Sequence, residues 1–81
     1  MMGLYYFDLR DGHDFVSDEE GLELCDTLAV QDEAGRALAG LSWDAVRNFK
    51  GSQSHEMSIE VRDSHGPVMQ VKFALELTRK L

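Results

Sequence analysis

The side chains best suited to chemistry in this sequence are carboxylates crowded into its first quarter. Residues 8–20 contain Asp8, Asp11, Asp14, Asp18, Glu19 and Glu20, with His13 among them. A hard divalent cation binds oxygen ligands at spaced loop positions, with a bidentate acid closing the shell. The spacing here does not match the calcium loop D-x-[DN]-x-[DN]-G, and Gly12 is misplaced for it. We therefore prefer a solvated acidic turn, and an acidic divalent-metal-binding or metal-responsive protein is the alternative function.

The other reactive side chains form no recognisable site in the sequence. The histidines His13, His55 and His65 fall in expected turns without H-x-x-x-H spacing, and the single cysteine, Cys25, has no C-x-x-C partner. No nucleophile elbow, phosphate loop or dinucleotide glycine pattern is present. We therefore predict surface histidines, an inert structural cysteine, no metal site, no cofactor, no catalytic residues and no enzymatic activity.

The charge is divided unequally along the chain. Residues 1–35 carry −9 and residues 36–81 carry +2, for a net charge of −7. Direct nucleic-acid binding needs a clustered basic face, which the sequence does not provide. A basic protein partner, or the basic half of a second copy, suits the acidic half better. Without a membrane-spanning run or a signal peptide, a soluble cytoplasmic protein with no membrane partner is expected.

A long amphipathic helix is predicted over residues 26–49, with Asp26 as its N-cap. Its main apolar stripe should face a sheet. The stripe comprises Val30, Ala34, Ala37, Leu38, Leu41, Ala45 and Phe49. Gly35 and Gly40 each cost about 1 kcal/mol relative to Ala inside a helix. Either they lower the stability of the helix without a purpose, or they mark close packing against the helix or a break near Gly40.

Alternating segments before and after this helix predict strands. Residues 3–10 alternate, and Asp11-Gly12 supplies a turn into a very short strand at residues 15–16. Residues 56–62 and 68–73 form a hairpin after the helix. The residues expected to face the helix are Tyr5, Phe7, Leu9, Met57, Ile59, Val61, Met69, Val71 and Phe73.

These elements predict a single small α+β domain over residues 1–81. Its three- or four-stranded antiparallel sheet carries one long helix on one face, in the order β(β)αββ. The end of the chain is ambiguous. Leu75 and Leu77 continue the strand alternation, whereas Phe73, Leu77 and Leu81 also fit helical spacing. We prefer a short helix over residues 74–81.

Three segments of the sequence resemble a known family. They are residues 5–12 (YYFDLRDG), residues 18–24 (DEEGLEL) and residues 59–63 (IEVRD), followed by Gly66. In this order they resemble a family of short uncharacterised alphaproteobacterial proteins, a domain of unknown function. The family usually has histidine, proline and proline where Asp8, Cys25 and Lys72 stand here. The resemblance implies the fold and a bacterial origin, and it brings no activity, cofactor or catalytic residue.

A second apolar strip on the helix suggests an interface. Leu28, Ala39, Trp43 and Val46 lie about half a turn away from the main stripe. An exposed strip around a tryptophan is typical of a binding surface. We predict a homodimer, formed through the helices in preference to the competing outer sheet face with Leu4 and Tyr6. The alternative is that Leu75, Leu77 and Leu81 cover the strip within one chain. The predicted function is a small cytoplasmic protein-interaction or regulatory module that associates with itself.

Overall fold

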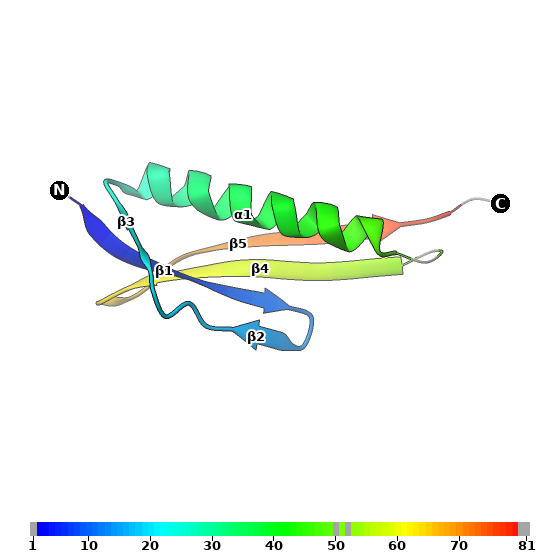
Figure 1. Cartoon of the computed structure of the whole chain (residues 1–81), viewed down its shortest axis with the longest axis horizontal. Helices are drawn as coiled ribbons and strands as arrows, with labels where there is room; N and C mark the ends of the chain where they lie inside the picture. The colour runs from blue at the N-terminus through cyan, green and yellow to red at the C-terminus, as the bar shows by residue number, and fades with distance from the viewer. Residues whose placement is uncertain (1, 50, 52, 80–81) are drawn as a thin grey trace.

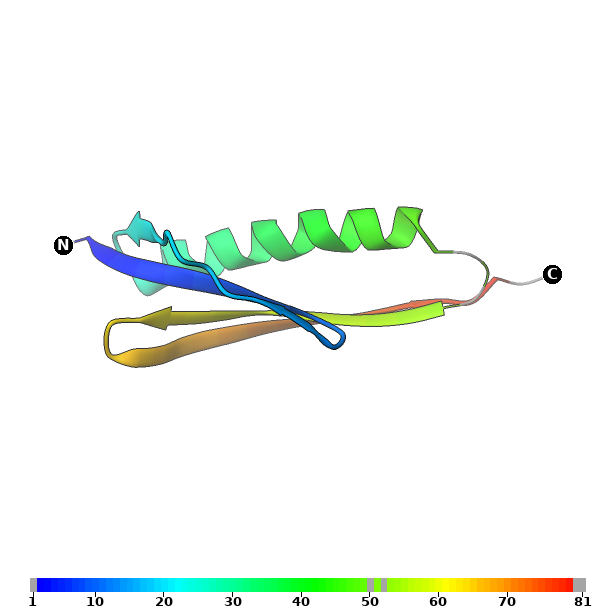
Figure 2. The ribbon, with the colours of Figure 1, turned by 60° about the horizontal axis from the view of Figure 1, so that its bottom comes forward.

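A computed structural model describes residues 2–49, 51 and 53–79 of the chain. One helix lies along one face of a single antiparallel sheet (Figure 1 and Figure 2). The elements are β1 (Gly3–Asp11), β2 (Asp14–Val16), β3 (Leu22–Leu24), α1 (Thr27–Arg47), β4 (Gln53–Asp63) and β5 (Gly66–Leu77). The predicted α+β class is confirmed. The sheet has five strands rather than three or four, because residues 22–24 pair with β1 instead of only leading into the helix.

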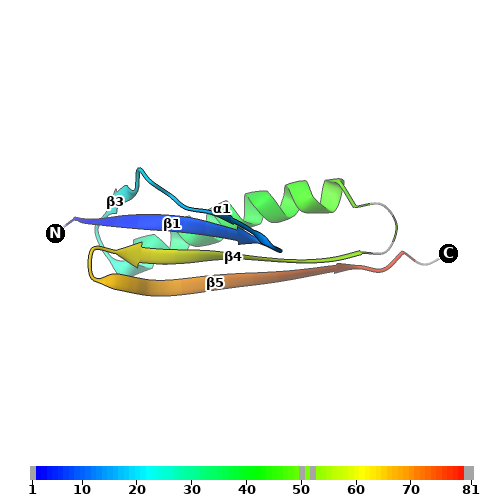
Figure 3. The ribbon, with the colours of Figure 1, turned by 90° about the horizontal axis from the view of Figure 1, so that it is seen from below.

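The sheet has the strand order β2-β1-β4-β5, and β3 pairs with the first part of β1. Figure 3 shows β1, β4 and β5 side by side, with β5 at the outer edge. Leu9 lies opposite Ile59, and Ile59 lies opposite Val71. Since side chains alternate between the faces of a strand, this register places the predicted inward residues of the three strands on one face.

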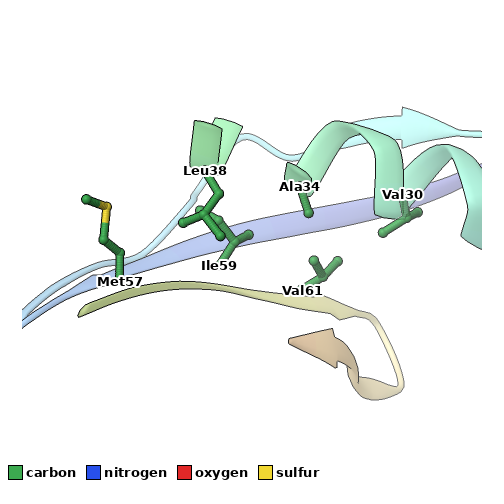
Figure 4. Packing of buried hydrophobic residues seen from close by; sticks show 6 residues of the cluster. All are labelled: Val30, Ala34, Leu38, Met57, Ile59 and Val61. Carbon is green, nitrogen blue, oxygen red and sulfur yellow. The ribbon is translucent and has the colours of Figure 1, made fainter. Parts of the chain in front are cut away.

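The core lies between that face and α1 (Figure 4). Val30, Ala34 and Leu38 point from the helix toward the sheet. They meet Met57, Ile59 and Val61 of β4, which are also buried. Two predictions for the helical stripe were wrong: Ala37 is exposed, and Phe49 lies beyond the helix with its ring edge on His55. The buried arc is narrower than the predicted stripe because a single sheet face covers only one side of the helix.

The helix is continuous from Thr27 to Arg47, so the break considered near Gly40 does not occur. Asp26 is the predicted N-cap, and its carboxylate accepts from the Ala29 N–H at 2.8 Å. A Cβ added at Gly35 or Gly40 would meet no atom within 4 Å. Close packing within the chain therefore does not account for either glycine.

The prediction of a C-terminal helix was wrong for residues 74–77, which belong to β5. Leu75 and Leu77 lie opposite His55 and Gln53 of β4. Because β4 already begins at Gln53, it offers backbone partners along this whole segment, whereas a helix of eight residues is unstable alone. Residues 80–81 lie outside the described residues.

Candidate interaction surface

Arg62 joins three segments on the sheet face that points away from the helix. Its Nε donates to Asp8 Oδ2 of β1 at 2.9 Å, and its Nη2 donates to the Asp18 carbonyl, also at 2.9 Å. The guanidinium lies 4.5 Å from the centroid of the Tyr6 ring. We expected Asp8 to face solvent, but it is only 6% exposed because these groups cover it. We call Tyr6, Asp8, Asp18 and Arg62 the Arg62 cluster.

Both carboxylates of the Arg62 cluster are held in their charged form. Burial raises the pKa of Asp8, but the hydrogen bond from Arg62 and the N–H of Asp18 outweigh it and lower this pKa overall. The N–H of Phe7 is the main group that lowers the pKa of Asp18. The hydrogen bond to Asp8 raises the pKa of Arg62. The cluster is thus an internally paired network that ties the residues after β2 to β1 and β4.

The cluster also completes the closure of the β1 edge. β2 pairs with residues 9–11 and β3 pairs with residues 3–5 on that edge. Between these two pairings, the Phe7 N–H donates to Asp18 Oδ2 at 3.0 Å. The other oxygen of Asp18 accepts from the N–H groups of Glu20 and Gly21 at 3.1 and 3.3 Å. This edge of the sheet therefore has little backbone left for a partner strand.

The candidate metal ligands of the acidic run do not converge. Among residues 2–49, 51 and 53–79, no group of three or more His, Cys, Asp or Glu side chains is placed to hold a metal ion. Asp18 serves the closure of β1, and Asp11 pairs with His55. His55 lies in β4 and not in the predicted turn, while His13 and His65 are exposed in turns as predicted. Cys25 is exposed and free, so it takes no part in the core.

The opposite edge of the sheet is open. β5 is paired with β4 from Gly66 to Leu77, with one register shift between Val61 and Arg62 of β4, and no strand in the described part of the chain pairs with its other side. The strand is 12 residues long. Proline and lysine on an edge strand discourage pairing with another strand. In β5, Pro67 lies near the start, and Lys72 lies in the middle. Such an edge is a template for another strand.

The predicted interface residues lie exposed on the helix. Leu28 is 71% exposed, Trp43 is 68% exposed and Val46 is 38% exposed. Ala39 is exposed as well. Leu28 and Ala39, together with Gly35, line a groove of about 980 Å³ whose opposite wall includes Val71 of β5. Leu28 and Ala39 therefore lie on the flank of the helix that is next to β5.

The alternative cover for this strip is excluded as far as the structure describes the chain. Leu75 and Leu77 are fixed in β5 by pairing with β4, so they cannot fold over Trp43. The third residue of that alternative, Leu81, lies outside the described residues. The strip and the open edge of β5 together form the candidate interaction surface.

A family model described as a domain of unknown function (DUF6894) matches residues 4–74, which is most of the chain. The chain belongs to the DUF6894 family. This confirms the resemblance to an uncharacterised domain family. No curated protein and no solved structure matches the chain. DUF6894 membership assigns no activity, and no helix in the described residues is long and apolar enough to cross a membrane.

The segments that suggested the DUF6894 family meet in space. The first supplies Tyr6 and Asp8, the second supplies Asp18 and the third supplies Arg62. Gly21 follows with a φ of +76°, and a Cβ there would lie 3.0 Å from the Tyr6 ring. Sequence reasoning missed this network. The signal available was that Asp8 and Arg62, two opposite charges, occupy outward positions of two strands.

Proposed function

We propose that this DUF6894 protein is a self-associating interaction module of the bacterial cytoplasm. Its interface is the candidate interaction surface, namely the strip Leu28, Ala39, Trp43 and Val46 with the adjoining edge of β5. The observation that supports this most is the exposure of Trp43, 68%, beside a C-terminal segment that is committed to the sheet. A monomer would leave this apolar surface in water.

The energetics favour covering the strip. Fully burying a large apolar side chain contributes about 1.5–3 kcal/mol relative to leaving it exposed. Tryptophan is among the residues that most often dominate an interface. In a symmetric dimer each contact occurs twice, because residue i of one copy meets residue j of the other and the reverse. A few such side chains then offset the entropy lost on association.

The test is the molar mass in solution of the wild type and two glutamate variants. We expect a dimer for the wild type at micromolar concentration and a folded monomer for Trp43→Glu, because a charge would be buried without a partner. Ala37→Glu is the matched control. Ala37 is exposed on the same helix but outside the strip, so this variant should remain a dimer.

Light scattering gives the mass, and circular dichroism shows whether each variant is folded. A wild type that remains monomeric at high micromolar concentration would contradict the proposed function. A Trp43→Glu variant that is folded and still dimeric would remove the strip from the interface but leave self-association in place.

A further inference from the structure

We infer that the partner is a second copy of this chain joined at the open edge of β5, antiparallel, with Ala74 on the two-fold axis. This rests on the proposed self-association and specifies the part of its interface that lies along β5. The two β5 strands would form the centre of one continuous sheet. A two-fold axis perpendicular to the sheet leaves both helices on the same face.

The first argument is the contrast between the two edges of the sheet. The chain uses residues 14–24 to close the β1 edge, and Asp18 caps the one backbone N–H of Phe7 in the gap between β2 and β3. Natural proteins blunt, cover or pair their exposed edges, because a long unpaired strand recruits other chains. The described chain gives the 12-residue β5 no comparable cover. A second β5 supplies the missing backbone partners.

The second argument is charge complementarity in one register. On the face away from the helix, β5 presents Lys72, Ala74 and Glu76 in alternation. With Ala74 opposite its own copy, Lys72 lies opposite the Glu76 position of the partner copy, and the pair occurs twice. Opposite charges directly across a strand pair stabilise it, and like charges destabilise it.

Neighbouring symmetric registers lack this match. An axis at Lys72 sets two lysines directly opposite each other, and an axis at Glu76 does the same with two glutamates. An axis at Phe73 or Leu75 leaves Ala74 opposite Lys72 or Glu76, so neither charge has a direct partner. Side-chain charge therefore selects the axis at Ala74.

The third argument comes from the helix-facing side of β5. Its contacts to the core are made by Val68, Met69 and Val71. Beyond them Phe73 is still 37% exposed. In the register with Ala74 on the axis, Phe73 lies beside the Leu75 position of the second copy. Aromatic and aliphatic side chains that meet across strands stabilise the pairing and lose exposed surface.

The same arrangement also brings the groove between α1 and β5 into the interface. Gly35 and Ala39 line that groove with Val71, so this flank of α1 is turned toward the β5 edge. Joining two β5 edges turns the two grooved flanks toward each other across the shared strands. The groove, the open edge of β5 and the exposed part of Phe73 then lie on a single interface.

Charge reversal tests the register. Lys72→Glu alone and Glu76→Lys alone should each raise the dimer Kd about tenfold, because each places like charges opposite twice. The double variant should return to within about threefold of the wild type. Inside one chain Lys72 lies opposite Ser58 and Glu76 lies opposite Ser54, but Glu56 and Glu60 are diagonal neighbours of Lys72. Circular dichroism must therefore show that the Lys72→Glu variant is folded before its dimer Kd is compared. If the double variant weakened the dimer by as much as the two single variants combined, the proposed register would be overturned.

Disulfide trapping separates the register from self-association itself. In a Cys25→Ser background, Ala74→Cys should cross-link on mild oxidation. Directly opposite residues of antiparallel strands have Cα atoms about 4.5–5.5 Å apart, within disulfide range. Gln70→Cys is the control on the same strand face, and its two copies would be about 26 Å apart, too far to bridge.

Dimers that cross-link at residue 74 and not at residue 70 support the inference. Dimers that cross-link instead through Lys72→Cys, or through none of these positions, overturn it and leave the proposed function standing. Monomers throughout, in the wild type and the Cys25→Ser background, overturn both. Non-reducing gels report the cross-link, and light scattering reports the mass of the same samples.

Discussion

Arg62 matters because it compensates a carboxylate that the fold buries. Asp8 keeps only 6% of its surface exposed, and an uncompensated charge there would be costly. Arg62 supplies two donors to it, and the N–H of Asp18 adds a third at 2.9 Å. Hydrogen bonds between charged groups are the stronger ones, so this network is a local determinant of stability.

Asp8→Asn should lower the free energy of unfolding by about 1–3 kcal/mol. The side-chain amide of asparagine has nearly the shape of the carboxylate, but it carries no charge. Its NH₂ group is a donor in place of one carboxylate oxygen, and it would face the N–H donors of Arg62. Asp14→Asn is the control, because Asp14 is exposed in β2 and should change stability by about 0.5 kcal/mol or less. Urea unfolding at fixed protein concentration measures both. Equal losses in the two variants would contradict a special role for Asp8.

The pH dependence follows from the same two carboxylates. The folded-state pKa values of Asp8 and Asp18 lie below the unfolded value of 3.8. A lowered pKa contributes stability that is present above the unfolded value and is lost as the pH falls through the folded value. Stability should therefore be nearly level from pH 7 to 5 and fall below about pH 4.

Unfolding curves of the wild type and Asp8→Asn across this pH range check that expectation. The acid-induced loss should be smaller in the variant, because one of the two groups no longer titrates. A steep loss between pH 7 and 5 would instead assign the stability to a group other than these carboxylates.

At the scale of the element, the two glycines of α1 lower the stability of the helix relative to alanine. Gly40→Ala should raise stability by up to about 1 kcal/mol, since the added methyl meets no atom within 4 Å and the helix loses one of its two glycines. Gly12→Ala is the contrasting variant. Its surroundings are equally empty, but its φ is +61°, so alanine is strained there.

Thermal unfolding distinguishes these two glycine variants. A gain of about 1 kcal/mol corresponds to roughly 4–8 °C in a domain of this size. Gly40→Ala should unfold above the wild type and Gly12→Ala below it. A loss of stability in Gly40→Ala would show that residue 40 of the helix requires glycine for a reason other than space.

The sequence predicted elements whose pattern is local and missed those that depend on distant partners. Asp26 and the stripe around Ala34 define the helix within one segment, and the alternation around Ile59 defines β4 in the same way. The pairing of residues 22–24 depends on the free edge of β1, about 20 residues away. Residues 74–77 are a strand because β4 begins at Gln53, and local spacing could not distinguish strand from helix there.

The same limit applied to the candidate surface. The helical period placed Leu28, Ala39, Trp43 and Val46 on one exposed strip, and the structure shows them exposed. The open edge of β5 was not predictable, because strand order in the sheet is set by long-range pairing. The burial of Asp8 was missed for a similar reason, since Arg62 lies 54 residues away in sequence.

At the scale of the whole molecule, the domain is long and thin. It measures 54 × 22 × 16 Å, and the buried apolar core in the described residues consists of Val30, Ala34, Leu38, Met57, Ile59 and Val61. Chains of this size bury about 60–65% of the surface of the unfolded chain, so a single thin core gives them limited stability. The proposed dimer would bury further apolar surface and so add to the stability of this thin core.

Calcium should not stabilise the molecule. A cation that binds only the folded state raises the melting temperature by mass action. The carboxylate of Asp18 already accepts from three backbone N–H groups, and that of Asp8 is paired with Arg62. Thermal scans in millimolar calcium and in chelator should coincide. A rise of several degrees in calcium would revive the metal-responsive alternative.

The pairing of β1 with β4 also bears on the order in which the chain folds. Tyr6 lies opposite Arg62, whereas Asp63 and Gly66 close the β4–β5 hairpin across a short turn. Closing a long loop costs more entropy than closing a short one. We therefore expect the β4–β5 hairpin and the helix α1 to form before β1 pairs with β4. β1 is then expected to dock last, onto a preformed surface, and to bring β2 and β3 with it. Substitutions at Asp8 would act mainly by accelerating unfolding, and substitutions in the hairpin turn would slow folding.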